Sequence, residues 1–166
     1  MFLSGKELEG LVCGNPPVIK NMVNPKNQIQ PNGVELTLRS VFRFFGSGQL
    51  TFDNSGRKLP EVLEIPFDES GLVFLAAGCY KIKFNEILSV PLDMLAIGRP
   101  RSSLLRMGVS IATALWDSGF KGETECLMIV SNPFGFRVSK DARLIQLLFS
   151  KLPTSVQKGY EGLFGE

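Results

Sequence analysis

The sequence contains no histidine, and this absence excludes several kinds of active site. A serine or cysteine nucleophile activated by histidine cannot be built, because no imidazole is available to take the proton. The zinc site of the common cytidine deaminases needs a histidine ligand and is excluded for the same reason. Any catalysis must therefore depend on carboxylates, hydroxyl groups, arginines or a metal ion that the ligand brings.

Cysteine is scarce, and long uncharged runs are missing. Cys13, Cys79 and Cys126 are far apart and form no C-x-x-C pair, which argues against a disulfide framework and a structural zinc site. We expect three reduced thiols in the core. No window reaches the roughly 18 to 20 uncharged residues that a membrane span needs, and the N-terminus lacks a signal-peptide pattern. The sequence predicts a soluble cytoplasmic protein without a membrane partner.

Neither sign of charge is in large excess, since 18 basic residues stand against 16 acidic ones. A net charge of +2 gives no global field for nonspecific nucleic-acid binding, so we expect no nucleic-acid partner and only a local anion site. A chain of 166 residues, 44% of them hydrophobic, is long enough for one domain with its own core. We expect this domain to cover residues 1–158 and a flexible glycine-rich arm to follow over residues 159–166.

The apolar residues follow a pattern that is typical of strands. In residues 34–38, VELTL, apolar and polar side chains alternate with the period of a strand that has one buried face. Similar runs cover residues 62–67, 72–76, 80–84, 110–116, 124–130 and 144–149. One helix is expected over residues 4–11, where S-x-x-E forms a capping box, and residues 13–33 show no sustained period. These features predict an all-β barrel or sandwich with a short N-terminal helix.

The stretch GRPRSSLLRMG, residues 98–108, concentrates three arginines and two adjacent serines between apolar segments. Guanidinium groups and hydroxyls are the donors that hold phosphate oxygens through charge-assisted hydrogen bonds. A phosphate site is therefore one interpretation of this stretch. A solvated arginine loop without a ligand is the other, and the residues alone leave both open.

A second stretch, ALWDSGFKGE, places the acid Asp117 between Trp116 and a Ser-Gly turn. An acid among apolar neighbours can act as a base, but it can equally cap a turn. Trp116, the single tryptophan, fits either a core position or a place beside a bound ligand.

Five stretches, in this order, resemble motifs of the deoxyuridine triphosphatase (dUTPase) and dCTP deaminase superfamily. They are QPNGVELTL (30–38), RSSLLRMG (101–108), ALWDSGFKGE (114–123), DARLIQLLF (141–149) and GYEGLFGE (159–166). The second is the most specific match. The first has Glu35 where the family usually has aspartate, and the fifth lacks the arginine and the Ser-Thr pair of many members.

The resemblance implies a distorted, jelly-roll-like β-barrel that forms a homotrimer with active sites between subunits. It also implies hydrolysis of dUTP to dUMP and pyrophosphate, with Mg²⁺ carried on the triphosphate. Asp117 would orient and deprotonate the attacking water, and Glu35 would contact the metal indirectly, through water. The substrate-binding residues implied by the resemblance are Arg101, Ser102, Ser103, Arg106, Phe120, Gln146, Tyr160 and Phe164.

Deamination of dCTP, alone or in a bifunctional enzyme, is the first alternative. Deaminases of the superfamily move protons with a glutamate on the strand after the third motif. The two alignments of that strand place Leu127 or Ile129 at this position, and neither side chain carries a proton. A shifted register could supply Glu123 or Glu125 instead.

A noncatalytic nucleotide-binding relative is the second alternative. It is favoured by Glu35 in place of aspartate and by the incomplete fifth motif. The extra methylene of glutamate could displace a metal-bound water by about an ångström and slow catalysis.

Overall fold

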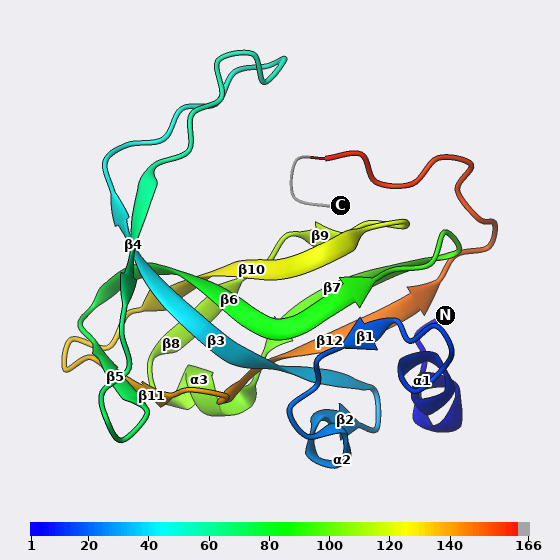
Figure 1. Ribbon diagram of the computed structural model, residues 1–166, viewed down its shortest axis with the longest axis horizontal. Coiled ribbons are helices and arrows are strands. Elements are labelled where there is room, and N and C mark those ends of the chain that lie inside the picture. The colour runs from blue at the N-terminus through cyan, green and yellow to red at the C-terminus, as the bar shows by residue number, and fades with distance from the viewer. Residues whose placement is uncertain (163–166) are drawn as a thin grey trace.

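A curled ten-stranded sheet makes up most of the computed structural model, which describes residues 1–162 (Figure 1). Its main path runs β8-β10-β6-β3-β12-β7-β9, with β1 on β6 and with β2 and β4 on β3; β5 and β11 form a separate pair. The strands are β1 (Ile19–Lys20), β2 (Ile29–Gln30), β3 (Gly33–Phe45), β4 (Glu61–Ile65), β5 (Leu72–Leu75), β6 (Gly78–Ser89), β7 (Met94–Pro100), β8 (Val109–Ala112), β9 (Leu115–Trp116), β10 (Lys121–Val130), β11 (Phe136–Ser139) and β12 (Arg143–Lys151). The predicted all-β class is confirmed.

Three short helices accompany the sheet: α1 (Gly5–Val12), α2 (Pro25–Gln28) and α3 (Ser102–Arg106). The predicted N-terminal helix is confirmed within one residue at each end, but the Ser4 side chain makes no capping hydrogen bond. The segment expected to be irregular contains α2, because the side chain of Asn24 accepts a hydrogen bond from Asn27 N–H (3.2 Å) and Pro25 opens the turn. No helix within residues 1–162 is long and apolar enough to span a membrane.

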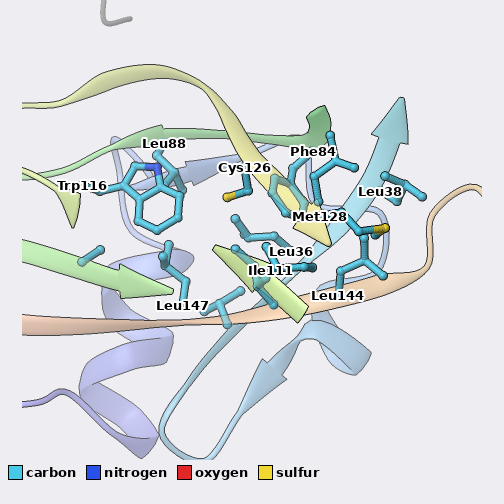
Figure 2. Close-up of a cluster of buried hydrophobic side chains, with 14 of the residues drawn as sticks. Leu36, Leu38, Phe84, Leu88, Ile111, Trp116, Cys126, Met128, Leu144 and Leu147 are labelled. Atoms are coloured by element: carbon cyan, nitrogen blue, oxygen red, sulfur yellow. The ribbon is translucent and has the colours of Figure 1, made fainter. Parts of the chain in front are cut away.

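The core lies inside the curl of the sheet (Figure 2). Residues of β6 and β10 alternate between this core and the outer surface, as the predicted strand period requires. Residues 33–38 of β3 are all buried, so the expectation of one buried face is wrong there: Glu35 is buried in ion pairs with two arginines and Thr37 in a hydrogen bond to Glu86. Cys126 is buried there, and burial raises the pKa of its thiol to about 12. Cys13 and Cys79 are exposed, so the expectation of three core thiols is wrong for these two.

A hairpin arm of residues 46–60 projects from the junction of β3 and β4 (Figure 1). An isolated bridge between Gln49 and Lys58 closes it. At its tip, Asp53 accepts hydrogen bonds from the backbone N–H and the hydroxyl of Ser55, at 3.0 and 2.8 Å. The polar contacts of Asp53 are therefore confined to the arm.

One carboxylate, Glu86, is fully buried on the inner face of β6. Its oxygens accept hydrogen bonds from the N–H and hydroxyl of Thr37, at 2.9 and 2.6 Å, and from Gln28 Nε2 at 2.6 Å. Gln28 Nε2 also donates to the carbonyl of Glu35 (2.9 Å). This buried polar chain ties α2 to β3 and β6. Burial raises the pKa of Glu86 above its usual value, although the three hydrogen bonds act in the opposite direction.

The raised pKa of Glu86 predicts a specific pH dependence of stability. Above about pH 4.5 the unfolded chain loses this proton before the folded chain does, so the free energy of unfolding decreases as the pH rises toward the folded pKa. Glu86→Gln removes this titration. Urea unfolding of both proteins between pH 4 and 8 should show that wild type loses stability relative to the variant by about 1.4 kcal/mol per unit of raised pKa. Parallel pH curves would contradict the assignment.

Candidate functional site

Arg101 directly follows β7 and precedes α3, and β12 holds it in place. Its backbone N–H donates to the carbonyl of Leu144 (2.9 Å), and its Nη1 donates to the carbonyl of Arg143 (3.1 Å). Its Nε lies 2.6 Å from Glu35 Oε1 on β3. Two strands therefore fix both the backbone and the guanidinium group of Arg101.

The side chain of Glu35 is only 7% exposed and lies between two arginines. Its second oxygen, Oε2, is 2.9 Å from Arg143 Nη1. Nη1 of Arg143 donates a hydrogen bond to the carbonyl of Asn27 (2.6 Å), and Oε2 is a buried acceptor without a hydrogen bond. We call Glu35, Arg101 and Arg143 the arginine cluster. Gln146 lies opposite Glu35 in the β3–β12 register and is half-buried.

Helix α3 presents the polar residues of the second motif to solvent. Leu104 is buried and anchors the helix, while Ser102, Ser103 and Arg106 are exposed. Arg106 Nη1 donates to Ser102 Oγ (3.3 Å). The structure thus places Arg101 and these three residues together at α3, and we call them the α3 group.

A tight turn carries Asp117 at the other end of β7. Phe120 N–H donates to the carbonyl of Asp117 (3.1 Å), and Ser118 Oγ donates to the carbonyl of Met94 (2.6 Å). Gly119 has a φ of +82°, and a Cβ there would lie 2.7 Å from the Cα of Gly159. The turn therefore requires glycine at this position, and it leaves the Asp117 carboxylate exposed.

A pocket of about 270 Å³ opens beside this turn. It is lined by Ala114, Leu115, Trp116, Phe120, Glu123, Glu125 and Tyr160, and we call it the turn pocket. Tyr160 N–H donates to the carbonyl of Ser118 (2.9 Å), and its ring meets that of Phe120 edge to face at 5.5 Å. The first residues of the C-terminal segment thus close over the turn. Phe164 lies outside the described residues, and a domain boundary at residue 158 stays a prediction.

The two glutamates of the turn pocket are engaged in ion pairs. Glu123 lies 2.8 Å from Arg39 and 3.2 Å from Lys83, and the hydrogen bond from Arg39 is the main reason why its pKa falls to about 2. Glu125 lies 3.2 Å from Lys81 and 3.1 Å from Lys83. Both carboxylates are therefore held in place by basic side chains of β3 and β6.

Leu127 and Ile129 lie further along β10, opposite Ala112 and Ser110 of β8. Both residues are half-buried and follow Glu123 and Glu125 on the outer face of the strand, because buried residues alternate with them. The described part of β10 therefore presents no carboxylate other than the two ion-paired glutamates.

The α3 group and the turn that carries Asp117 lie at opposite ends of β7. Strand β9 pairs with β7 so that Trp116 is opposite Ala96, which places Asp117 level with Leu95. Arg101 is six residues further along, a separation of about 20 Å at roughly 3.3 Å per residue. The structure thus groups Arg101, Ser102, Ser103 and Arg106 in one place, and it groups Asp117, Phe120 and Tyr160 in another.

Arg143 is a candidate site residue that the sequence did not predict. It lies in the stretch DARLIQLLF, three residues before Gln146. That arginine was the available signal, but its pairing with Glu35 depends on contacts between distant parts of the chain.

The chain matches a family model described as dCTP deaminase-like over residues 2–152. The probable deoxyuridine 5'-triphosphate nucleotidohydrolases of Methanosarcina mazei and Methanococcoides burtonii are 46% and 47% identical over 163 residues, 98% of this chain and 95% and 96% of theirs. The deoxyuridine 5'-triphosphate nucleotidohydrolase of Methanocaldococcus jannaschii is 36% identical, over 84% of this chain and 88% of its own. The dCTP deaminase structure from Agrobacterium tumefaciens aligns with a TM-score of 0.68 at 20% identity, over 89% of this chain and 47% of that one.

Packing between Gly98 and Trp116 positions strand β9, which directly precedes Asp117. A Cβ at Gly98 would lie 2.9 Å from the indole ring, so Gly98→Ala should displace this ring and destabilise the fold by about 1–3 kcal/mol. Urea unfolding followed by the fluorescence of the single tryptophan measures both effects. Gly10→Ala is the control, because a Cβ there has no neighbour within 4 Å and should be neutral or stabilising. Equal stability and spectra for Gly98→Ala and wild type would contradict this role.

Proposed function

The chain belongs to the dCTP deaminase-like family, and we infer that within this family it hydrolyses dUTP to dUMP and pyrophosphate. One observation carries this conclusion: relatives that are nearly half identical over almost the full chain are named dUTP nucleotidohydrolases. The absence of histidine is compatible with this chemistry, because attack of water at phosphorus needs charge neutralisation and one general base.

We propose that the α3 group and Gln146 bind the triphosphate. Arg101 is supported from β3 and β12 and is still 30% exposed, and the two serines and Arg106 are exposed beside it. Guanidinium and hydroxyl donors on a short, anchored helix suit an anionic ligand with several oxygens. Gln146 lies on β12 opposite Glu35, two residues beyond the Leu144 carbonyl that holds the backbone of Arg101.

The turn pocket is the proposed deoxyuridine site. Phe120 and Tyr160 supply an aromatic wall for the deoxyribose, and Phe120 would leave no room for a 2'-hydroxyl. The segment that joins β8 to β9 lines the pocket through Ala114, and β9 lines it through Leu115 and Trp116, so their backbone groups would contact the uracil. Asp117, exposed at the mouth of the turn, would take a proton from the attacking water. Phe164 would belong to the same closing segment.

We propose that a complete site needs two copies of the chain, in a homotrimer. About 20 Å along β7 separates Asp117 from Arg101, which is too far for one copy to hold a phosphorus atom between them. A neighbouring copy could bring its α3 group to the turn pocket of the first. Cyclic symmetry would then complete each site in the same way.

Mg²⁺ would enter this site bound to the triphosphate oxygens of the substrate, the ligands that this ion prefers. Within residues 1–162 no three or more Asp, Glu, Cys or His side chains are grouped so that they could hold a metal ion. Glu35 Oε2 is a buried acceptor without a hydrogen bond, so it is the atom of the arginine cluster to which a metal-bound water could donate. The bound ion would neutralise phosphate charge.

Deamination of dCTP is less well supported. It needs a carboxyl group that gives and takes a proton near the base, and both pocket glutamates are held in ion pairs with lysine or arginine. The low pKa of Glu123 works directly against this role. Leu127 and Ile129 cannot replace it.

The reaction itself is tested by incubating the protein and Mg²⁺ with dUTP or dCTP and separating the products by chromatography. We expect dUMP and pyrophosphate from dUTP and no change in dCTP. Deaminated products from dCTP would contradict the assignment in favour of a deaminase. Binding of a nonhydrolysable dUTP analogue without turnover of dUTP would instead indicate a noncatalytic relative.

Replacing Asp117 by Asn should lower the turnover of dUTP by about 10²–10⁴-fold, because the general base is lost. Binding of the nonhydrolysable analogue should stay close to that of wild type, since the turn and its backbone contacts remain. Asp53→Asn in the projecting arm is the matched control and should keep full turnover. Near-normal turnover of Asp117→Asn, measured as pyrophosphate release, would exclude this residue as the base.

A further inference from the structure

Arg143 belongs to the arginine cluster and has more N–H donors than its contacts within the fold use. Its Nη1 donates to the carbonyl of Asn27 and faces Glu35, while the N–H groups of Nε and Nη2 make no hydrogen bond within residues 1–162. A guanidinium group carries five N–H donors. Arg101 uses two of its own, on Glu35 and on the carbonyl of Arg143, and keeps three. Side chains that are 30% and 35% exposed can offer these remaining donors to a ligand.

The negative charge of Glu35 allows the guanidinium groups of Arg101 and Arg143 to lie close to each other. Each carboxylate oxygen lies within 3 Å of one arginine, so the negative charge offsets their mutual repulsion. The cluster as a whole keeps one positive charge. Because the carboxylate is 7% exposed, it lies beneath the arginines and is shielded from an anion that approaches from solvent.

Two residues of helix α2 keep this arrangement in place. Helix α2 contributes Asn27, whose carbonyl orients Arg143, and Gln28, whose Nε2 binds the carbonyl of Glu35. The same Gln28 group donates to the buried Glu86 (2.6 Å). The backbone at Glu35 and the guanidinium group of Arg143 are therefore both fixed by one short helix.

We propose that Arg143 is a further substrate-binding residue and that Glu35 positions Arg101 and Arg143 as a pair for the polyphosphate of a nucleoside triphosphate. The proposal rests on the proposed function for the identity of the nucleotide but not for the binding of the phosphate chain. Two planar guanidinium groups offer several parallel N–H donors, which suits adjacent phosphate groups better than one arginine does. Glu35 acts through the arginines and is a positioning residue.

Calorimetric binding of inorganic tripolyphosphate, without Mg²⁺, tests the pair independently of hydrolysis and of any metal contact. Arg143→Ala should weaken binding by about 10–100-fold, the range for hydrogen bonds to a charged group. Arg143→Met keeps the aliphatic stem and should lose as much, which separates charge from packing. Arg137→Ala on β11 is the control, since this arginine packs on Phe74 (5.8 Å) and should not affect binding.

The variant Glu35→Gln distinguishes a positioning role of Glu35 from a purely electrostatic one. If Glu35 were only a negative charge near an anion site, its removal would tighten tripolyphosphate binding. If it positions the arginines, binding weakens, and the KM for dUTP rises more than kcat falls. Circular dichroism and urea unfolding of each variant identify those that retain the wild-type fold and qualify for this comparison.

Unchanged binding by folded Arg143→Ala and Arg143→Met would overturn the proposal, as would tighter binding by Glu35→Gln. Failure of wild type to bind tripolyphosphate at millimolar concentration would also overturn it. Tripolyphosphate binding that depends on Arg143, in a protein that leaves dUTP intact, would support the pair and contradict the proposed reaction.

Discussion

Strand β7 pairs with β12 on one side and with β9 on the other, and this double register determines where each candidate site residue lies. The C-terminal end of β7 leads into Arg101 and α3, where β12 supplies the carbonyls that bind the arginine. The N-terminal half of β7 pairs with Trp116 of β9, and the turn with Asp117 follows directly after this tryptophan. Backbone hydrogen bonds of a sheet cannot slip by one residue without turning every side chain to the other face. The separation of Asp117 and Arg101 along β7 is therefore set by the register of the sheet.

Buried polar contacts connect the arginine cluster to the core. Glu35, Gln28 and Glu86 form a chain of donors and acceptors that reaches from the surface arginines to the inside of the sheet. A buried carboxylate destabilises the fold unless hydrogen bonds compensate its desolvation, and Glu86 receives three of them. Such a chain favours one arrangement of α2 against β3. This arrangement also places Asn27 and Glu35 where they orient Arg143.

Much of the fold follows from local sequence patterns, and the missed parts have physical reasons. The alternation of apolar and polar residues predicted the strands, and one face of β6 and of β10 is indeed buried. Residues 34–38 form a strand as predicted but are buried on both faces, because ion pairs and hydrogen bonds compensate the burial of Glu35 and Thr37. Strand β7 escaped prediction since MLAIGRP is apolar on both faces and gives no period. Helix α2 has four residues and depends on a cap at Asn24. In the candidate site, Arg101 was found by residue type and motif, whereas Arg143 was missed because its pairing with Glu35 needs β3, β12 and α2 together.

Subunit complementation tests most directly whether each copy carries only half of a site. Arg101→Ala and Asp117→Asn are each expected to be inactive alone, and the two proteins would be unfolded together, refolded as a mixture and assayed for pyrophosphate release from dUTP. If Arg101 and Asp117 act from different copies, random assembly restores about a quarter of the sites and a corresponding share of wild-type activity. If both residues act from the same copy, no mixed assembly contains an intact site. Activity that stays at the level of the separate variants in refolded oligomers would contradict the shared site.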